Sequence, residues 1–168
     1  MNIKRNNHMK NVFFLIVFIL FSPLQTYAGT YYNARFNFKV DYPDSFIPAG
    51  ESDNGDGQRF INSTANAVII VYGSYNIDIG GRDYTCSFKR YLNDHKNLNV
   101  TYKRELKDGF VISGLSGKDI EYNKVVMTKE NSSGSPVCLS LTIKYPTDQK
   151  VAFDKIVKNV VDSFHPTN

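Results

Sequence analysis

Carboxylate side chains gather in one short polar segment, GESDNGDGQRF, which runs from Gly50 to Phe60. Glu51, Asp53 and Asp56 lie close together there, beside the flexible backbone of two glycines. Carboxylate oxygens are the ligands that Ca²⁺ prefers, and an EF-hand-like loop also needs a glycine for its sharp turn. The segment therefore has to be compared with a calcium loop, a binding loop and a plain polar turn.

The spacing of this segment does not fit an EF-hand-like calcium loop. Such a loop takes oxygen ligands at positions 1, 3, 5 and 12, with glycine at position 6. Placing Gly57 at position 6 puts Ser52 at position 1 and Ser63 at position 12. The bidentate carboxylate required at position 12 is missing, so the sequence predicts no metal site here.

Two interpretations of the segment remain open. Asp and Asn side chains often hydrogen-bond to their own backbone in turns, which would explain the composition without any ligand. The segment is nevertheless long for a simple connection, and long ordered loops are often functional. In that second interpretation the contact residues are Glu51, Asp53, Asn54, Asp56 and Arg59.

Catalytic patterns are weak elsewhere in the chain. Beyond the first 28 residues the histidines are His95 and His165, and neither belongs to an HExxH motif or a Cys/His cluster. The segment SGLSGK, from Ser113 to Lys118, has neither nucleophile-elbow nor P-loop spacing and is better explained as a hairpin turn. We therefore predict no catalytic residue and no cofactor. Two carboxylates, or a carboxylate and His95, could still meet in space.

Cys86 and Cys138 are the only cysteines of the chain. Alternate residues from Val137 to Tyr145 form an apolar face, which leaves Cys138 on the other face of that strand. Cys86 also lies off the apolar stripe of its predicted helix. Two cysteines that avoid the core-facing pattern of an exported chain predict a disulfide, worth about 4 kcal/mol for a loop of about fifty residues. A redox-active pair is the alternative, without Cys-x-x-Cys spacing.

Export is indicated by the first 28 residues. Lys4, Arg5 and Lys10 precede an apolar run from Val12 to Phe21, and Thr26-Tyr27-Ala28 resembles a cleavage site. The run of about ten residues is too short to cross a membrane, which takes about twenty. We predict a signal peptide over 1–28, with Met1 or Met9 as start, and no integral membrane anchor after cleavage.

Removal of this segment nearly cancels the net charge of the chain. It holds three of the 20 Lys and Arg residues and none of the 16 Asp and Glu residues, so the mature chain has a net charge of about +1. A nearly neutral domain without a basic block gives no electrostatic reason to expect nucleic acid as a partner. Residues 29–168 are the right length for a single domain.

The residues discussed above would be positioned mainly by antiparallel strands. Alternation from Arg35 to Asp41 predicts a strand ending at Pro43, and the continuous apolar run of 67–72, AVIIVY, predicts a central strand covered on both faces. Asp108-Gly109 predicts a hairpin between 99–107 and 110–113. The turn of 132–136 leads into a last strand over 137–145.

Two helices are predicted beside these strands. The last one has Thr147 as its N-cap, and its apolar side chains fall on one stripe that should lie on the sheet: Phe153, Ile156, Val157, Val160, Val161 and Phe164. A shorter helix is predicted from Asp83 to His95, with Tyr84, Phe88, Tyr91 and Leu92 on one side. The expected fold class is therefore α+β, a mostly antiparallel sheet flanked by helices.

Several short motifs resemble a known family. The strand FNFKVDYP, the closing helix FDKIVKNVVDSF and the preceding Tyr145-Pro146 are similar to the PsbP-like and Mog-type α/β/α sandwich family. The strings YYNARF, DNGDGQRF, FVISG and EYNK also resemble uncharacterised exported bacterial proteins. The resemblance implies an antiparallel sheet of about six strands between helices and a non-enzymatic accessory role. Photosystem and Ran-GTPase partners do not transfer, and the family offers no catalytic residue to transfer.

The functional expectation is a periplasmic or secreted binding protein that is not an enzyme. Its most specific form is an immunity or inhibitor protein that inserts the segment of 50–60 into a toxin or envelope enzyme. The alternative is a small-ligand carrier or envelope-stress factor. A sizeable apolar pocket between helix and sheet would favour this alternative.

Overall fold

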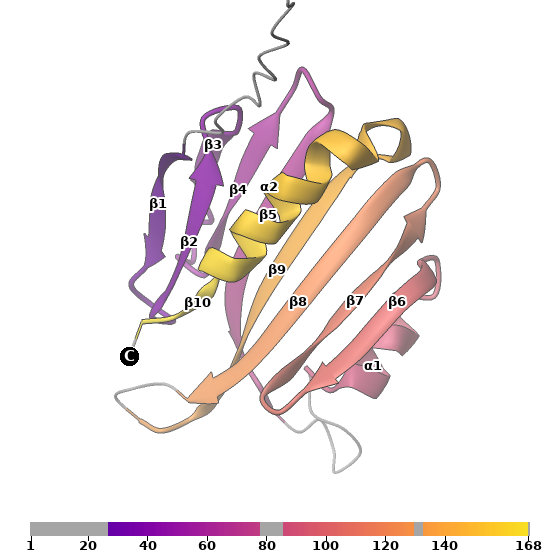
Figure 1. The fold of residues 1–168 in the computed structure, drawn as a ribbon. Helices are drawn as coiled ribbons and strands as arrows, with labels where there is room; N and C mark the ends of the chain where they lie inside the picture. Colours follow the sequence, from indigo (N-terminus) through magenta and orange to yellow (C-terminus); the bar gives the residue numbers. More distant parts are fainter. Residues whose placement is uncertain (1–26, 78–85, 130–132, 168) are drawn as a thin grey trace, which may run out of the picture.

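The computed structural model describes residues 27–77, 86–129 and 133–167. Within these residues the chain forms two antiparallel sheets (Figure 1). The smaller has the order β1-β2-β10, and the larger has the order β3-β4-β5-β9-β8-β7-β6. The strands are β1 (Tyr27–Asn33), β2 (Phe38–Pro43), β3 (Ile47–Glu51), β4 (Gly57–Asn62), β5 (Ala67–Tyr75), β6 (Asn99–Leu106), β7 (Gly109–Ser116), β8 (Asp119–Lys129), β9 (Pro136–Pro146) and β10 (His165–Pro166).

The helices lie on opposite sides of the seven-stranded sheet. Helix α2 (Lys150–Ser163) crosses one side diagonally, next to the small sheet, and the short helix α1 (Phe88–Asp94) lies behind β6 and β7 (Figure 1). The predicted α+β fold class is confirmed. The larger sheet has seven strands rather than about six, and β1, β2 and β10 form a separate sheet.

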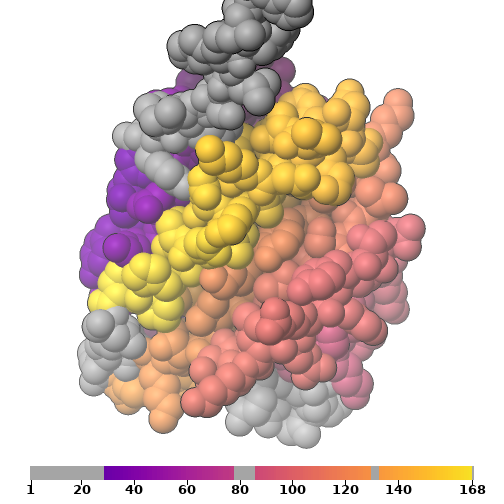
Figure 2. Space-filling view, viewed as in Figure 1, coloured from indigo at the N-terminus to yellow at the C-terminus, as the bar shows by residue number. Residues whose placement is uncertain are grey.

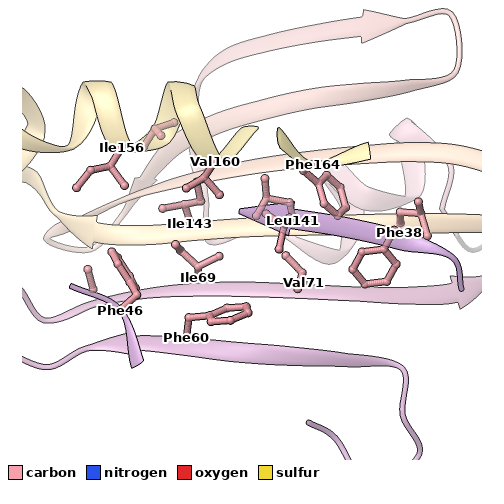
Figure 3. Close-up of a cluster of buried hydrophobic side chains, with 14 of the residues drawn as sticks. Phe38, Phe46, Phe60, Ile69, Val71, Leu141, Ile143, Ile156, Val160 and Phe164 are labelled. Carbon is pink, nitrogen blue, oxygen red and sulfur yellow. The ribbon is translucent and has the colours of Figure 1, made fainter. Parts of the chain in front are cut away.

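The main core lies between α2 and the seven-stranded sheet. Val160 and Ile156 of α2 face Ile143 of β9, and Phe60 and Ile69 extend the contact across β4 and β5 (Figure 3). The predicted stripe of α2 is confirmed, because its inward side chains are buried or half-buried. Full burial of each such side chain contributes about 1.5–3 kcal/mol relative to exposure.

The C-terminal end of α2 is fixed by a lysine of the sheet. Lys124 of β8 points to the α2 side, and its ammonium donates to the backbone carbonyl oxygens of Val161 (2.9 Å) and Phe164 (3.1 Å). These carbonyls have no partner inside the helix, so the lysine satisfies the helix end. Burial lowers the pKa of Lys124, against an opposing effect of Asp162.

The predicted first strand begins later than its alternation indicates. Residues 34–37 form the turn of the β1-β2 hairpin, and Asn37 has a φ of 49°. Phe36 therefore does not continue β2, and its ring packs against Gly73 of β5. A Cβ atom on Gly73 would lie 2.3 Å from the Cγ atom of Phe36, so only glycine leaves room for this ring.

Two predicted hairpins are confirmed by the structure. Gly109 begins β7 directly after the turn that follows β6, with a φ of 150°. SGLSGK ends β7 and turns into β8 at Gly117, which has a φ of 65° and thus takes the left-handed conformation that glycine tolerates.

Both helices differ in detail from their predictions. Thr147 is not the N-cap of α2: a 3₁₀ turn, Thr147–Gln149, precedes that helix and Gln149 occupies its N-cap position. Helix α1 is described from Phe88 to Asp94, and Ser87 caps it by accepting from the backbone N–H of Arg90. Residues 83–85, the start of the predicted helix, lie outside the described residues.

The side of the sheet opposite α2 has a second, smaller core. Phe88, Tyr91 and Leu92 of α1 pack over buried side chains of the sheet and of the segment after α1, namely Leu98, Phe110, Ile112, Val125 and Cys138. The prediction that Cys138 avoids a core is therefore wrong, because its strand is buried on both faces at that point. The sulfur atoms of Cys86 and Cys138 lie at disulfide distance, and their Cα atoms are 6.3 Å apart.

Over the described ranges, neither helix combines the length and the apolar character that a membrane crossing requires. Most of the predicted signal peptide lies outside these ranges. Strand β1 begins at Tyr27, two residues before the predicted mature N-terminus at Gly29.

Candidate binding surface

The acidic loop between β3 and β4 is a closed turn that is held by hydrogen bonds of its own backbone and side chains. The backbone N–H of Ser52 donates to the carbonyl of Gly57 (2.9 Å), and that of Gly55 donates to the carbonyl of Ser52 (2.8 Å). The Asp56 carboxylate accepts from the Ser52 hydroxyl (2.6 Å) and from the Asn54 amide (2.9 Å). These bonds account for Asn54 and Asp56 as turn-forming residues.

A second set of hydrogen bonds fixes this loop to β1 and to the turn that follows it. The Tyr31 hydroxyl donates to Oε1 of Glu51 (2.6 Å), and the buried Asn33 amide donates to the carbonyl of Gly55 (2.9 Å). The Arg35 guanidinium donates to the carbonyl of Asn54 (2.5 Å). The motif YYNAR thus holds the loop in one conformation.

The contact between Tyr31 and Glu51 is a bond from a neutral phenol to a carboxylate. Burial raises the pKa of Tyr31 to about 12, and the hydrogen bond to Glu51 adds to this rise. The phenol is therefore protonated at neutral pH and is available as a donor. Hydrogen bonds to a charged group are stronger than those between neutral groups, so this bond restrains the loop effectively.

The structure separates the five predicted contact residues into two groups. Glu51, Asn54 and Asp56 belong to the hydrogen-bond network that shapes the loop. Asp53 and Arg59 are exposed and make no side-chain hydrogen bond or ion pair with any residue of the described segments. Asp53 and Arg59 are therefore the members of the set that are free to meet a partner.

Arg59 belongs to a largely uncovered region on the far side of the seven-stranded sheet. On that side it lies opposite Ile70, while Ile61 lies opposite Val68 and Ile47. Helix α1 packs over the β7, β8 and β9 part of the same side and leaves this region bare. We call this region the open face; it consists of Ile47, Arg59, Ile61, Val68, Ile70 and Tyr72.

The open face is apolar and accessible. Ile47 is 70% exposed, Ile61 37% and Tyr72 39%, and Val68 and Ile70 are half-buried. The prediction that β5 is covered on both faces is wrong for this half of the sheet. Sequence reasoning missed these residues because the run AVIIVY indicates apolar faces without showing what covers them. No local pattern could have found them, because exposed Ile61 is as apolar as its buried neighbour Phe60.

Two hollows flank Arg59 on this surface. One, of about 260 Å³, lies beside the acidic loop and is lined in part by Gly57, Ile70 and Tyr72. The other, of about 440 Å³, is lined in part by Ile61, Asp119 and Lys144. The Lys144 ammonium lies 3.3 Å from the Asp119 carboxylate, so these two charges compensate each other.

The histidines do not meet carboxylates in the described part of the chain. The His95 ring stacks on that of Tyr91 at 3.9 Å between centroids, and its Nδ1 lies 2.9 Å from the Tyr91 carbonyl oxygen. His165 is exposed in β10. Neither ring forms an ion pair with a carboxylate of the described residues, and no group of three or more His, Cys, Asp or Glu side chains there could hold a metal ion.

Comparison with known proteins identifies the fold. No protein-family model matches the chain, and no curated protein matches its sequence. Solved structures do match: the PsbP of the cyanobacterium Synechocystis sp. PCC 6803, CyanoP, superposes with a TM-score of 0.53 at 11% identity, over 82% of this chain and 91% of that one. The chain has the PsbP/Mog1-like fold.

Two further structures share the PsbP/Mog1-like fold. LpqN of Mycobacterium tuberculosis, described as involved in cell envelope biogenesis, gives a TM-score of 0.54 at 14% identity, over 83% of this chain and 90% of LpqN. The Ran-binding protein Mog1p of Saccharomyces cerevisiae gives 0.50 at 13% identity, over 86% and 97%. The resemblance predicted from the motifs is thereby confirmed at the level of the fold.

This PsbP/Mog1-like fold leaves a groove on the α2 side of the sheet. The groove lies between α2 and β6, has a volume of about 470 Å³ and is mostly apolar. Figure 2 shows this side, where α2 stands as a diagonal yellow ridge and β6 lies at the right. The apolar and aromatic lining consists of Tyr102, Leu115, Ile120, Tyr122, Tyr145 and Val157.

Proposed function

We propose that this chain is exported and acts as a non-enzymatic accessory protein by binding another protein. The most specific form of this proposal is that the chain is an immunity or inhibitor protein, which blocks a toxin or an envelope enzyme in the periplasm or the medium. The sulfur atoms of Cys86 and Cys138 lie at disulfide distance, which supports export, because disulfides persist in oxidising compartments.

The rigid acidic loop is the observation on which this proposal depends. Tyr31, Asn33 and Arg35 hold the loop against β1, and Asp53 at its tip remains exposed. A loop that is already ordered loses little conformational entropy on binding, so more of its contact energy remains as affinity. Inhibitory loops that enter a cleft gain most from such order.

Two neighbours of the same fold support an accessory role without fixing the partner. Mog1p is a Ran-binding protein, and LpqN is involved in cell envelope biogenesis. Both descriptions concern those proteins. They support the proposal because one protein with this fold, Mog1p, binds another protein, and a second, LpqN, is involved in cell envelope biogenesis.

Affinity capture tests the proposal. The bait is the mature domain, Gly29 to Asn168, exposed to envelope and secreted fractions of its own source. A matched pair of variants in β1 reports on the loop: Tyr31→Phe removes the bond to Glu51, whereas Tyr32→Phe removes a bond to Asn37 in the turn after β1. We expect one protein to be recovered with the wild type and Tyr32→Phe, and recovery to fall with Tyr31→Phe. Recovery of no specific protein contradicts the proposal.

The groove beside α2 favours a second candidate function, a small-ligand carrier or envelope-stress factor. Pockets of about 300–1,000 Å³ with mostly apolar walls and a few polar groups are typical of small-ligand sites. This groove has the right size, and Thr101, Ser113 and Lys150 supply polar groups. A thermal-shift screen should then find ligands that stabilise the wild type and lose their effect in Leu115→Asp. A screen without any stabilising compound would remove the candidate.

A further inference from the structure

Arg59 is the one charged residue of the open face, and its neighbours on that face are apolar. Its nearest cross-strand neighbour is Ile70, and Ile61 lies two residues along the same strand. Gly57, on the other side, has no side chain, so Tyr72 opposite it borders the hollow next to Arg59. Among the described residues no carboxylate pairs with Arg59.

The acidic residues near Arg59 are already engaged. Asp119, on the far side of the larger hollow, pairs with Lys144. Glu51 and Asp56, which line the smaller hollow, accept hydrogen bonds within the loop network. The donors to Glu51 and Asp56 are neutral groups, so both carboxylates keep their charge, but among the described residues neither forms an ion pair with Arg59. Arg59 is the one charged residue of the open face itself.

The apolar side chains around Arg59 have the composition of an interface centre. Tyrosine and arginine are enriched among residues that dominate binding energy, and large exposed apolar patches mark interaction sites. Ile47 and Ile61 on one side of Arg59, and Tyr72 on the other, expose apolar side chains on this sheet. A partner that covers it would also remove Arg59 from water, which is unfavourable unless a carboxylate meets the guanidinium.

This requirement selects the kind of partner. A phosphate backbone or an anionic membrane surface is recognised by several clustered cations, whereas the open face has a single free one. A second copy docked through the same face, with its two-fold axis near Arg59, would bring one Arg59 towards the other. A different protein that presents a carboxylate among apolar side chains needs only one cation on this surface and brings no second arginine to it.

We infer that the open face is a docking surface for a partner protein that presents an Asp or Glu flanked by apolar side chains, with Arg59 as the ion-pair partner. Ile47, Ile61 and Tyr72 form the apolar ring that excludes water from this ion pair. The inference rests on the proposed function and names the chemistry of the partner. It concerns a surface next to the acidic loop, not the loop itself.

Peptide display tests this chemistry even while the partner is unidentified. A random 12-residue library is selected on the mature wild-type domain, on Arg59→Glu and on Arg104→Glu, a matched charge reversal at an exposed position of β6. The wild type and Arg104→Glu should enrich peptides with Asp or Glu between apolar residues. Arg59→Glu should bind these peptides at least about tenfold more weakly and should enrich Lys or Arg instead. Peptides that bind all three proteins equally, or no enrichment at all, would overturn the inference.

A second measurement separates this inference from the proposed function. The captured protein is titrated against wild type, Arg59→Glu, Arg59→Lys and Ile47→Asp. Loss of at least about tenfold in affinity with Arg59→Glu and Ile47→Asp, partial retention with Arg59→Lys, and a cross-link from Tyr72 to a segment with Asp or Glu support the inference. Equal affinity for all four proteins overturns it and leaves the proposed function standing. Dimerisation in sedimentation, or flotation with anionic vesicles, that Arg59→Glu abolishes would also overturn it.

Discussion

The hydroxyl of Tyr31 lies 2.6 Å from Oε1 of Glu51 and joins the first strand of the chain to the acidic loop. Tyr31 belongs to the β1-β2 hairpin and Glu51 ends β3, so the loop conformation depends on how this hairpin docks. The amide of Asn33 also donates to the hydroxyl of Tyr31 (2.9 Å), which makes the contact part of a chain of bonds. The acidic loop is thus a product of tertiary structure as well as of its own turn residues.

Removal of this bond should loosen the loop. Tyr31→Phe keeps the ring that packs against Phe38 and Phe60 but deletes the donor to Glu51. We expect a loss of about 1 kcal/mol in the free energy of unfolding and faster amide hydrogen exchange over 52–57. Tyr32→Phe removes the bond from the Tyr32 hydroxyl to the half-buried Asn37 in the hairpin turn and should leave exchange in the loop unchanged. Equal exchange in both variants would show that the loop does not depend on Tyr31.

Burial of the Tyr31 phenol, together with its bond to Glu51, makes stability sensitive to alkaline pH. The pKa of Tyr31 is about 12 in the folded protein, against about 10 in an unfolded chain, so folding favours the protonated phenol. This contribution is complete below pH 10 and is lost as pH rises towards 12. Burial also raises the pKa values of Tyr91, Tyr122 and Tyr145. Urea denaturation at pH 8, 10 and 11 should show falling stability, with a shallower fall in Tyr31→Phe. A parallel fall in both proteins would contradict this.

Replacement of Gly73 by a residue with even the smallest side chain should destabilise the fold. An added Cβ atom would lie 2.3 Å from Cγ of Phe36, far inside contact distance, so the ring would have to leave its place on β5. We expect Gly73→Ala to lower the free energy of unfolding by about 1–3 kcal/mol in chemical denaturation, as overpacking does. The double variant Gly73→Ala/Phe36→Leu should recover part of the loss. A double variant as unstable as the sum of both single changes would contradict the contact.

The cysteine pair should contribute stability as a disulfide. Cys86 and Cys138 are 52 residues apart, and a cross-link over such a loop is worth about 4 kcal/mol in the chain-entropy model. The double variant Cys86→Ser/Cys138→Ser should lose about this much and should expose the second core to a hydrophobic dye, because α1 would lose its link to β9. Thiol titration of the denatured wild type checks the premise. Two free thiols in protein isolated from the oxidising compartment would contradict it.

Local patterns predicted both helices and the strands β2, β5, β6, β7 and β9, but gave no bounds for β1, β3, β4, β8 and β10. The apolar stripe of α2 and the alternation from Val137 to Tyr145 each describe one face of one element, and both faces are buried as expected. Hairpins at Gly109 and Gly117 follow from glycine conformations that few other residues tolerate. These features could be read from the sequence because neighbours along the chain determine them.

The features that the sequence did not predict depend on pairing between distant strands. Arg59 lies beside Tyr72 only because β4 and β5 pair in one particular register. Cys138 is buried because α1 packs over one end of the sheet, whereas Ile61 and Tyr72 are exposed because nothing in the described chain covers the other end. An apolar run such as AVIIVY looks the same in both situations, so a candidate docking surface cannot be distinguished from a core by pattern alone.

The measurement that tests the central claim most directly is hydrogen exchange of the mature domain, free and re-isolated after incubation with concentrated envelope and secreted fractions. If the domain works by binding a protein through its rigid loop, amides of 52–57 and of β4 and β5 should gain protection. If no amide gains protection, or if protection is confined to β6, β7 and α2 around the groove, the claim is contradicted.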